Sequence, residues 1–319
     1  MHSIEKPCLA NPVIADRQTS RLADLSRRLI AASIAAVLVI VSSAGAKAQE
    51  PESQSERGID TKNMFGFTSG TDVGLAGERE LELETDLAFQ KRAGSYNAVE
   101  QNVIFEFSPS DAFEIDATLL GAYDQISRVD GLANRTEANF DGLATKFNYV
   151  FVQRSPSSPI GLTVWIEPAW TRIDDAGKLN KGFSAETRII LDTELVPDRL
   201  FAALNLIYAP QISHDFGAPG WTRSADLGVS GALAYALETN VLLGAELEYF
   251  RAYNGLTFGT FAGNALYFGP TLYVRVNKTV FVGAAISTQI AGNAAGDPNH
   301  LDLTNFSRNK AELTIGIEF

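Results

Sequence analysis

From Glu78 to the C-terminus, apolar and polar residues alternate with a period of two. In the first such segment four apolar residues alternate with four acids, Leu81, Leu83, Leu87 and Phe89 against Glu80, Glu82, Glu84 and Asp86. The last segment repeats this arrangement, with Leu313, Ile315, Ile317 and Phe319 against Glu312, Thr314, Gly316 and Glu318. Successive side chains of a strand point to opposite faces, so the pattern predicts strands with one apolar and one polar face.

Ten further segments of the same kind lie between these two, near residues 96–107, 113–126, 141–152, 160–173, 183–195, 199–212, 223–237, 241–253, 265–276 and 279–290. The twelve predicted strands are mostly ten to fourteen residues long, about twice the ~5–6 residues that are usual in globular proteins. A tilted strand needs ~9–11 residues to cross a bilayer. The strand length therefore favours a membrane-spanning sheet.

The predicted connections differ between the two ends of the strands. Compact turns follow the second, fourth, sixth, eighth and tenth strands, whereas longer stretches such as 128–139, 214–222 and 292–309 follow most of the others. This asymmetry is typical of bacterial outer-membrane barrels. We therefore predict an all-β fold, a transmembrane antiparallel up-and-down β-barrel of about twelve strands over residues 78–319. A secreted soluble β-sandwich would also alternate apolar and polar residues, but the strand length and the unequal connections disfavour it.

Residues 1–48 have the pattern of a cleaved signal peptide. Arg27 and Arg28 precede an uncharged apolar run, and Ala46-Lys47-Ala48 matches the small-x-small cleavage pattern. The alternative is a retained membrane anchor, because the apolar stretch approaches the ~20 residues of a spanning helix. Cleavage removes Cys8, the single cysteine, together with six bases and three acids, and changes the formal net charge from −12 to −15. Residues 49–77 are then predicted to be a flexible periplasmic segment with a Gly-rich turn.

The Gly-rich turn covers Phe65–Gly74 and Gly77–Glu80. Its glycines do not have the spacing of a phosphate-binding loop, and no helix is expected after them. The motif resembles the N-terminal segment of the outer-membrane transporters grouped as the phenol-degradation-pathway (MetA-type) family. The resemblance implies a single-chain barrel that moves small aromatic or other hydrophobic compounds.

The C-terminal strand carries a second resemblance. A chain that ends in alternating apolar residues and a final Phe resembles the signal recognised by the outer-membrane barrel-assembly machinery. The residues that carry it are Leu313, Ile315, Ile317 and Phe319. The resemblance implies that this machinery is a partner of the chain and that the barrel is inserted into outer-membrane lipid.

A closed barrel in hydrocarbon turns its apolar face to lipid and its polar face to the lumen. The lumen-lining candidates include seventeen acids, Glu80, Glu82, Glu84, Asp86, Glu106, Glu114, Asp116, Asp124, Glu167, Glu186, Asp192, Glu194, Asp226, Glu246, Glu248, Glu312 and Glu318, against four bases, Lys146, Arg188, Arg275 and Lys310. This excess predicts a lumen of negative potential. The alternative is that the inward acids are only solvated or are paired within a plugged barrel.

Three functions fit this pattern. The first is passive passage of small solutes, with cations or neutral molecules preferred. The second, a lipid-modifying enzyme, usually needs a His base beside a Ser nucleophile or a metal-activated water. His214 and His300 are the histidines outside the signal peptide, and Ser213 and His214 would point to opposite faces of a strand. The third is an adhesive barrel that binds partners through its loops.

We therefore predict no enzyme activity and no catalytic, cofactor or metal residues. The acidic balance, 38 Asp and Glu against 26 Lys and Arg, also argues against nucleic acid as a partner, because phosphate contacts need clustered bases.

Overall fold

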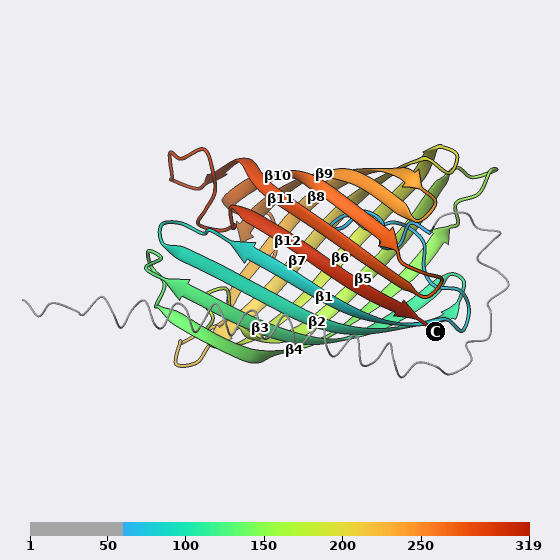
Figure 1. Ribbon diagram of the computed structural model, residues 1–319. Helices are drawn as coiled ribbons and strands as arrows, with labels where there is room; N and C mark the ends of the chain where they lie inside the picture. Colours follow the sequence, from blue (N-terminus) through green and yellow to red (C-terminus); the bar gives the residue numbers. More distant parts are fainter. Residues whose placement is uncertain (1–59) are drawn as a thin grey trace, which may run out of the picture. The chain divides into compact units, whose positions relative to one another are not determined.

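The computed structural model describes residues 60–319, and the predicted signal peptide lies outside this range. The described chain forms twelve antiparallel strands (Figure 1). They are β1 Arg79–Phe89, β2 Ser95–Ser110, β3 Phe113–Ser127, β4 Arg135–Val152, β5 Ile160–Ile173, β6 Leu179–Val196, β7 Leu200–Asp215, β8 Thr222–Glu238, β9 Val241–Asn254, β10 Thr260–Arg275, β11 Val280–Ala294 and β12 Asn309–Glu318. Each strand pairs with its neighbours in sequence, and β1 pairs with β12. The predicted closed barrel is confirmed.

The outer face of the barrel is apolar. Its large side chains are more than a third exposed, among them Val103, Leu119, Leu143, Ile166, Ile189, Leu206, Val229, Leu247, Phe268 and Ile286. A continuous apolar surface of this kind is costly in water and suits the hydrocarbon of a membrane. Among residues 60–319 no helix is long and apolar enough to cross a membrane.

The strands extend further than the alternation predicts, mainly at one end of the barrel. There β4 already begins at Arg135, so the predicted loop 128–139 shrinks to 128–134. The loop predicted at 214–222 likewise shrinks to 216–221, and the one at 292–309 to 295–308. Paired strands can continue past the residues that alternate, since backbone hydrogen bonds need no particular side chain. We call this end, which carries the 295–308 loop, the loop end, and the opposite end the short-turn end.

The interior of the barrel contains its own hydrophobic core. Met64 and Phe65, which precede the first strand, pack against inward side chains of several strands, Phe201, Ala203, Ala232, Ala234, Ala236, Leu242, Tyr273 and Phe281. Met64 and Phe65 are both at most 1% exposed. The short-turn half of the barrel is therefore filled by the chain's own N-terminal residues.

Candidate functional site

Residues 60–77, which we call the inner segment, run inside the barrel before the chain enters β1 (blue in Figure 1). The segment runs in, turns near Gly66 and returns. Gly66 has a φ of +94°, a conformation that glycine adopts without strain. The two arms touch at Gly70, where an added Cβ would lie 2.1 Å from the carbonyl oxygen of Thr61. The sequence pattern predicts residues 49–77 to be a flexible periplasmic segment and leaves a plug role open only for residues 49–63; in the structure residues 60–77 pack inside the barrel.

Asp192 on β6 holds both arms of the inner segment. Its carboxylate accepts hydrogen bonds from Thr61 Oγ1 at 2.5 Å and from the backbone N–H of Thr71 at 2.9 Å. The guanidinium of Arg154, in the turn after β4, lies 2.9 Å from Asp192 and 3.1 Å from Asp72. Burial opposes the charge of Arg154, but Asp72 and Asp192 still raise the pKa of its guanidinium. Asp192 thus binds both arms of the segment directly, and Arg154 links it to Asp72 in the second arm.

The turn of the inner segment is held by side chains of β7 and β9. The Glu246 carboxylate on β9 accepts hydrogen bonds from the backbone N–H groups of Phe67 at 3.2 Å and Thr68 at 2.9 Å. Asn205 on β7 accepts from the N–H of Ser69 at 2.8 Å and donates to its carbonyl oxygen at 2.9 Å. These contacts satisfy backbone groups that have no strand partner.

Lys62 neutralises a buried group of acids near the short-turn end. Its ammonium forms ion pairs with Glu106, with Glu114 at 3.2 Å and with Glu80 at 3.4 Å. Burial alone would lower the pKa of Lys62, but Glu106, Glu114 and Glu80 together hold it well above the ordinary lysine value. Lys62 therefore stays charged and supplies the positive charge that these acids require.

Two bases of the barrel wall contact the turn itself. Arg188 on β6 donates to the carbonyl oxygen of Phe67 at 2.9 Å and lies 3.2 Å from Ser69 Oγ. The ammonium of Lys310 on β12 lies 3.9 Å from the centre of the Phe67 ring and 2.6 Å from the carboxylate of Glu248. Phe67 is thus clamped between an inward arginine and an inward lysine.

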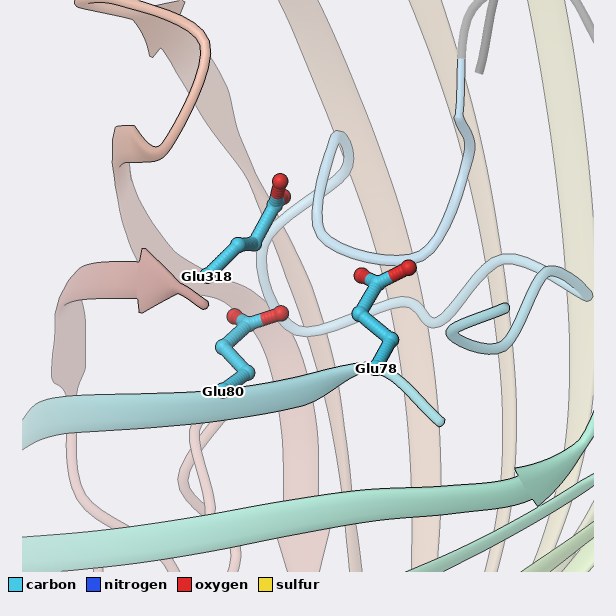
Figure 2. Close-up of side chains that lie close together, drawn as sticks. All are labelled: Glu78, Glu80 and Glu318. Carbon is cyan, nitrogen blue, oxygen red and sulfur yellow. The ribbon is translucent and has the colours of Figure 1, made fainter. Parts of the chain in front are cut away.

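Three groups of acids near the short-turn end have carboxylate oxygens within 4.8 Å of one another, the spacing of a metal site. They are Glu78, Glu80 and Glu318, shown in Figure 2, then Glu80, Glu82 and Glu106, and finally Glu106, Glu114 and Asp116. Each group is already in contact with a basic side chain of the protein. Lys62 contacts Glu80 and Glu106, and Arg275 lies 2.8 Å from Glu318. The arrangement therefore does not call for a metal ion.

Between the turn of the inner segment and the loop end lies a cavity of about 390 Å³, which we call the vestibule. Phe67 forms part of its wall together with four other aromatic residues, Tyr96, Phe250, Tyr267 and Phe306. Seven acids line it, Asp86, Glu100, Asp124, Asp141, Asp174, Asp175 and Asp226, against two bases, Lys91 and Lys310. The vestibule thus combines a negative lining with aromatic surface.

The sequence-predicted lumen residues all lie on the inner face of the barrel. Ten are buried, Glu80, Glu82, Glu106, Glu114, Asp116, Asp124, Asp192, Glu246, Glu248 and Glu318. Eleven are partly exposed, Glu84, Asp86, Lys146, Glu167, Glu186, Arg188, Glu194, Asp226, Arg275, Lys310 and Glu312. Many of the buried acids contact the inner segment instead of open lumen, and whether the others line a solute pathway stays a prediction.

Four acids of the vestibule were not predicted from the sequence, namely Glu100, Asp141, Asp174 and Asp175. Lys62, Lys91, Arg154 and Asn205 were not predicted either. Their partners are far away in the chain, as with Asn205 and Ser69, which are 136 residues apart. A usable signal was the apolar pair Met64-Phe65 within a polar stretch, because such a pair is more often buried than exposed.

A model of the family of unknown function DUF6662 matches residues 57–319, which include the inner segment and all twelve strands. The chain belongs to this family. No curated protein sequence matches the DUF6662 chain.

Solved structures resemble the DUF6662 barrel in fold. The COG4313 outer membrane channel from Pseudomonas putida F1 has a TM-score of 0.55 at 11% identity, over 78% of this chain and 98% of that one. The β domain of the Bordetella autotransporter BrkA has a TM-score of 0.51 at 11% identity, over 76% of this chain and 100% of that one. These likenesses support the outer-membrane type of barrel. The predicted resemblance to the phenol-degradation transporters is not confirmed by them.

Asp60, at the start of the inner segment, makes its docking depend on pH. Burial and then the neighbouring Asp72 raise the pKa of Asp60 to about 7, while Lys62 acts in the opposite direction. A raised pKa means that the docked segment binds the proton more tightly than the released one, whose Asp has an ordinary pKa near 3.8. Docking is therefore fully favoured below about pH 4 and weakens as the pH rises through about 7.

We expect the amide hydrogen-exchange rates of residues 64–71 to rise between pH 5 and 8. The rise should be larger than the one that the intrinsic pH dependence of exchange in an unstructured peptide produces. Asp60→Asn, compared with the unchanged chain at each pH, should remove this excess. Glu238→Gln, at an exposed position of the short-turn end, serves as the control. Equal exchange profiles of the Asp60→Asn and unchanged chains would contradict the assignment to Asp60.

Proposed function

We propose that this chain is an outer-membrane channel for small solutes, with cations preferred over anions, and that the inner segment must shift before solutes pass. The solute pathway would run from the loop end through the vestibule to the short-turn end. The proposal places the barrel in the outer membrane, with the short-turn end in the periplasm and the C-terminal strand as the contact for the assembly machinery.

The observation that carries the cation preference is a row of acids across three neighbouring strands. Asp86 on β1 lies directly opposite Glu100 on β2 and directly opposite Glu312 on β12. Like charges placed opposite each other on a sheet repel one another. A cation passing this row lowers that repulsion and an anion raises it, so the row favours cations.

The contacts of the inner segment support the proposal that it blocks the solute pathway and can move away. Many of its contacts with the wall are hydrogen bonds to carboxylate and amide side chains such as Asp192, Glu246 and Asn205. Water can replace such a hydrogen bond at a net cost of about 1 kcal/mol for a neutral partner and about 1.5–3 kcal/mol for a charged one. Met64 and Phe65 are the apolar anchors that a release must uncover.

The test is the current carried by the full chain in planar bilayers under a KCl gradient. We expect intermittent openings and a reversal potential with the sign of the K⁺ potential. Asp86→Asn combined with Glu100→Gln should lower the preference for K⁺, whereas Glu238→Gln should not. A reversal potential with the sign of the Cl⁻ equilibrium potential, or no current at any voltage, would refute the proposed function.

The two other functions receive no support from a specific contact. The ring of His214 packs against Trp221, with 5.4 Å between their centres, and no hydrogen bond joins it to Ser213 within residues 60–319. The 295–308 loop of the adhesive alternative is turned partly inward, because Asn305, Phe306 and Ser307 line the vestibule. We therefore retain the channel as the single proposal.

A further inference from the structure

The two bases of the vestibule are already occupied. Lys91 forms an ion pair with Asp175 at 3.2 Å, and Lys310 forms one with Glu248, which does not line the vestibule. Neither lysine forms an ion pair with another acid of the lining within residues 60–319.

Two further lining acids stabilise the backbone. Asp141 accepts hydrogen bonds from the N–H groups of Arg172 and Ile173. Asp174 accepts from those of Ala176 and Lys178, in the turn between β5 and β6. The acids left over are Asp86, Glu100, Asp124 and Asp226, which form no ion pair with any Lys or Arg among residues 60–319.

Among these four acids, Asp124 on β3 gives the strongest indication that the vestibule binds a ligand. It is only 4% exposed, and its Oδ2 atom is buried without a hydrogen-bond partner in the described chain. A buried carboxylate without a partner carries a large desolvation cost unless a positive or hydrogen-bonding group approaches it. Asp124 also lines the vestibule, so a positive group held in the cavity would offset the charge of this carboxylate.

The spacing of the four acids does not suit a metal ion. Calcium and magnesium require several oxygen atoms within a few ångströms. The groups of three acids that meet this requirement in residues 60–319 all lie at the short-turn end, and none contains a vestibule acid. The four acids instead face a cavity of about 390 Å³, within the ~300–1,000 Å³ usual for small-molecule sites.

The aromatic part of the lining complements the charge. Phe250 and Phe306 lie with ring centres 6.5 Å apart, and Tyr96 and Tyr267 belong to the same wall. Lysine ammoniums already lie over three of these rings, with Lys91 5.6 Å from the ring centre of Tyr96 and Lys310 5.2 Å and 5.1 Å from those of Phe250 and Tyr267. The rings therefore offer apolar surface for the body of a ligand, and the unpaired acids offer the charge for its ammonium. We propose that the vestibule binds an organic cation, an ammonium group attached to an apolar or aromatic body, with the ammonium directed at Glu100 and Asp124. This inference rests on the proposed function and names the class of solute that the channel selects.

Isothermal titration calorimetry of the full chain in detergent tests this inference, with benzyltrimethylammonium as the probe. Benzyl alcohol and benzoate are the neutral and anionic controls of similar size. We expect saturable binding of the cation alone. Glu100→Gln combined with Asp124→Asn should weaken it about tenfold, because both charges that face the ammonium are lost. Glu238→Gln, remote from the vestibule, should leave the affinity unchanged.

Three results would overturn the inference. The first is that benzyl alcohol binds as tightly as the cation, and the second is that Glu238→Gln loses as much affinity as the double variant. The third is that Mg²⁺ binds saturably and the organic cation does not. Binding heats do not depend on ion flow, so the two proposals fail separately. Cation-selective currents without binding of the probe would refute the organic-cation site alone. Probe binding by a barrel that never conducts would support the site and refute the channel.

Discussion

A disulfide between the inner segment and the barrel wall should hold the channel closed until it is reduced. Thr68 Oγ1 and Ser230 Oγ on β8 lie 3.0 Å apart, and both residues are 1% exposed. Cysteines at these positions place their sulfur atoms close enough for a disulfide with little movement of the backbone. We expect Thr68→Cys/Ser230→Cys to show almost no current when oxidised and intermittent openings after addition of dithiothreitol.

The natural sequence favours this experiment because Cys8 is its single cysteine. A Cys8→Ser background removes any dependence on cleavage of the predicted signal peptide. The Thr68→Cys and Ser230→Cys single variants are the matched controls, and their currents should not respond to the reductant. If the fully oxidised double variant conducts like its reduced form, solutes pass without movement of the inner segment, and that part of the proposal is wrong.

Replacement of Lys62 by Met should release the inner segment. The change leaves Glu80, Glu106 and Glu114 together in a buried site without their base. Removal of one partner from a buried ion pair typically costs about 3–5 kcal/mol. At about 1.4 kcal/mol per tenfold change, the released form should become at least about a hundredfold more populated.

The release can be followed by maleimide labelling of Thr68→Cys at a fixed pH, since this position is buried when the segment is docked. Lys62→Met should accelerate labelling strongly, and the exposed Lys178→Met should not. Glu106→Gln added to Lys62→Met should slow labelling again, because it removes one of the uncompensated charges. Labelling at the same rate with and without Lys62 would show that this ion-pair group does not hold the segment.

The barrel was predictable because its strands obey a local rule. A strand with one face toward lipid repeats every two residues, so Leu81, Leu83 and their neighbours reveal both the strand and its faces without knowledge of the rest of the chain. The same rule fixed which acids point inward. It could not fix what those acids contact, because Asp192 and Glu246 meet the inner segment across more than a hundred residues of sequence.

The inner segment was not predictable from the same rule, since residues 60–77 have no regular period. Glycine and polar residues suggest a flexible linker when they are judged by composition alone. The segment becomes ordered because the barrel wall presents side chains such as Asn205 and Glu246 to its backbone groups. That complementarity depends on the closed sheet and appears only once the strands are in register.

The inner segment continues directly into β1, which forms the seam of the cylinder with β12 through ten register pairs. Tension applied to the chain ahead of residue 60 therefore first loads the hydrogen bonds to Asp192, Asn205 and Glu246. Beyond Glu78 the same tension acts along β1, where the backbone N–H of Phe319 still bonds the carbonyl oxygen of Arg79. A load along a strand is shared by all of its hydrogen bonds, so a mechanical pull can unseat the segment while the seam stays intact.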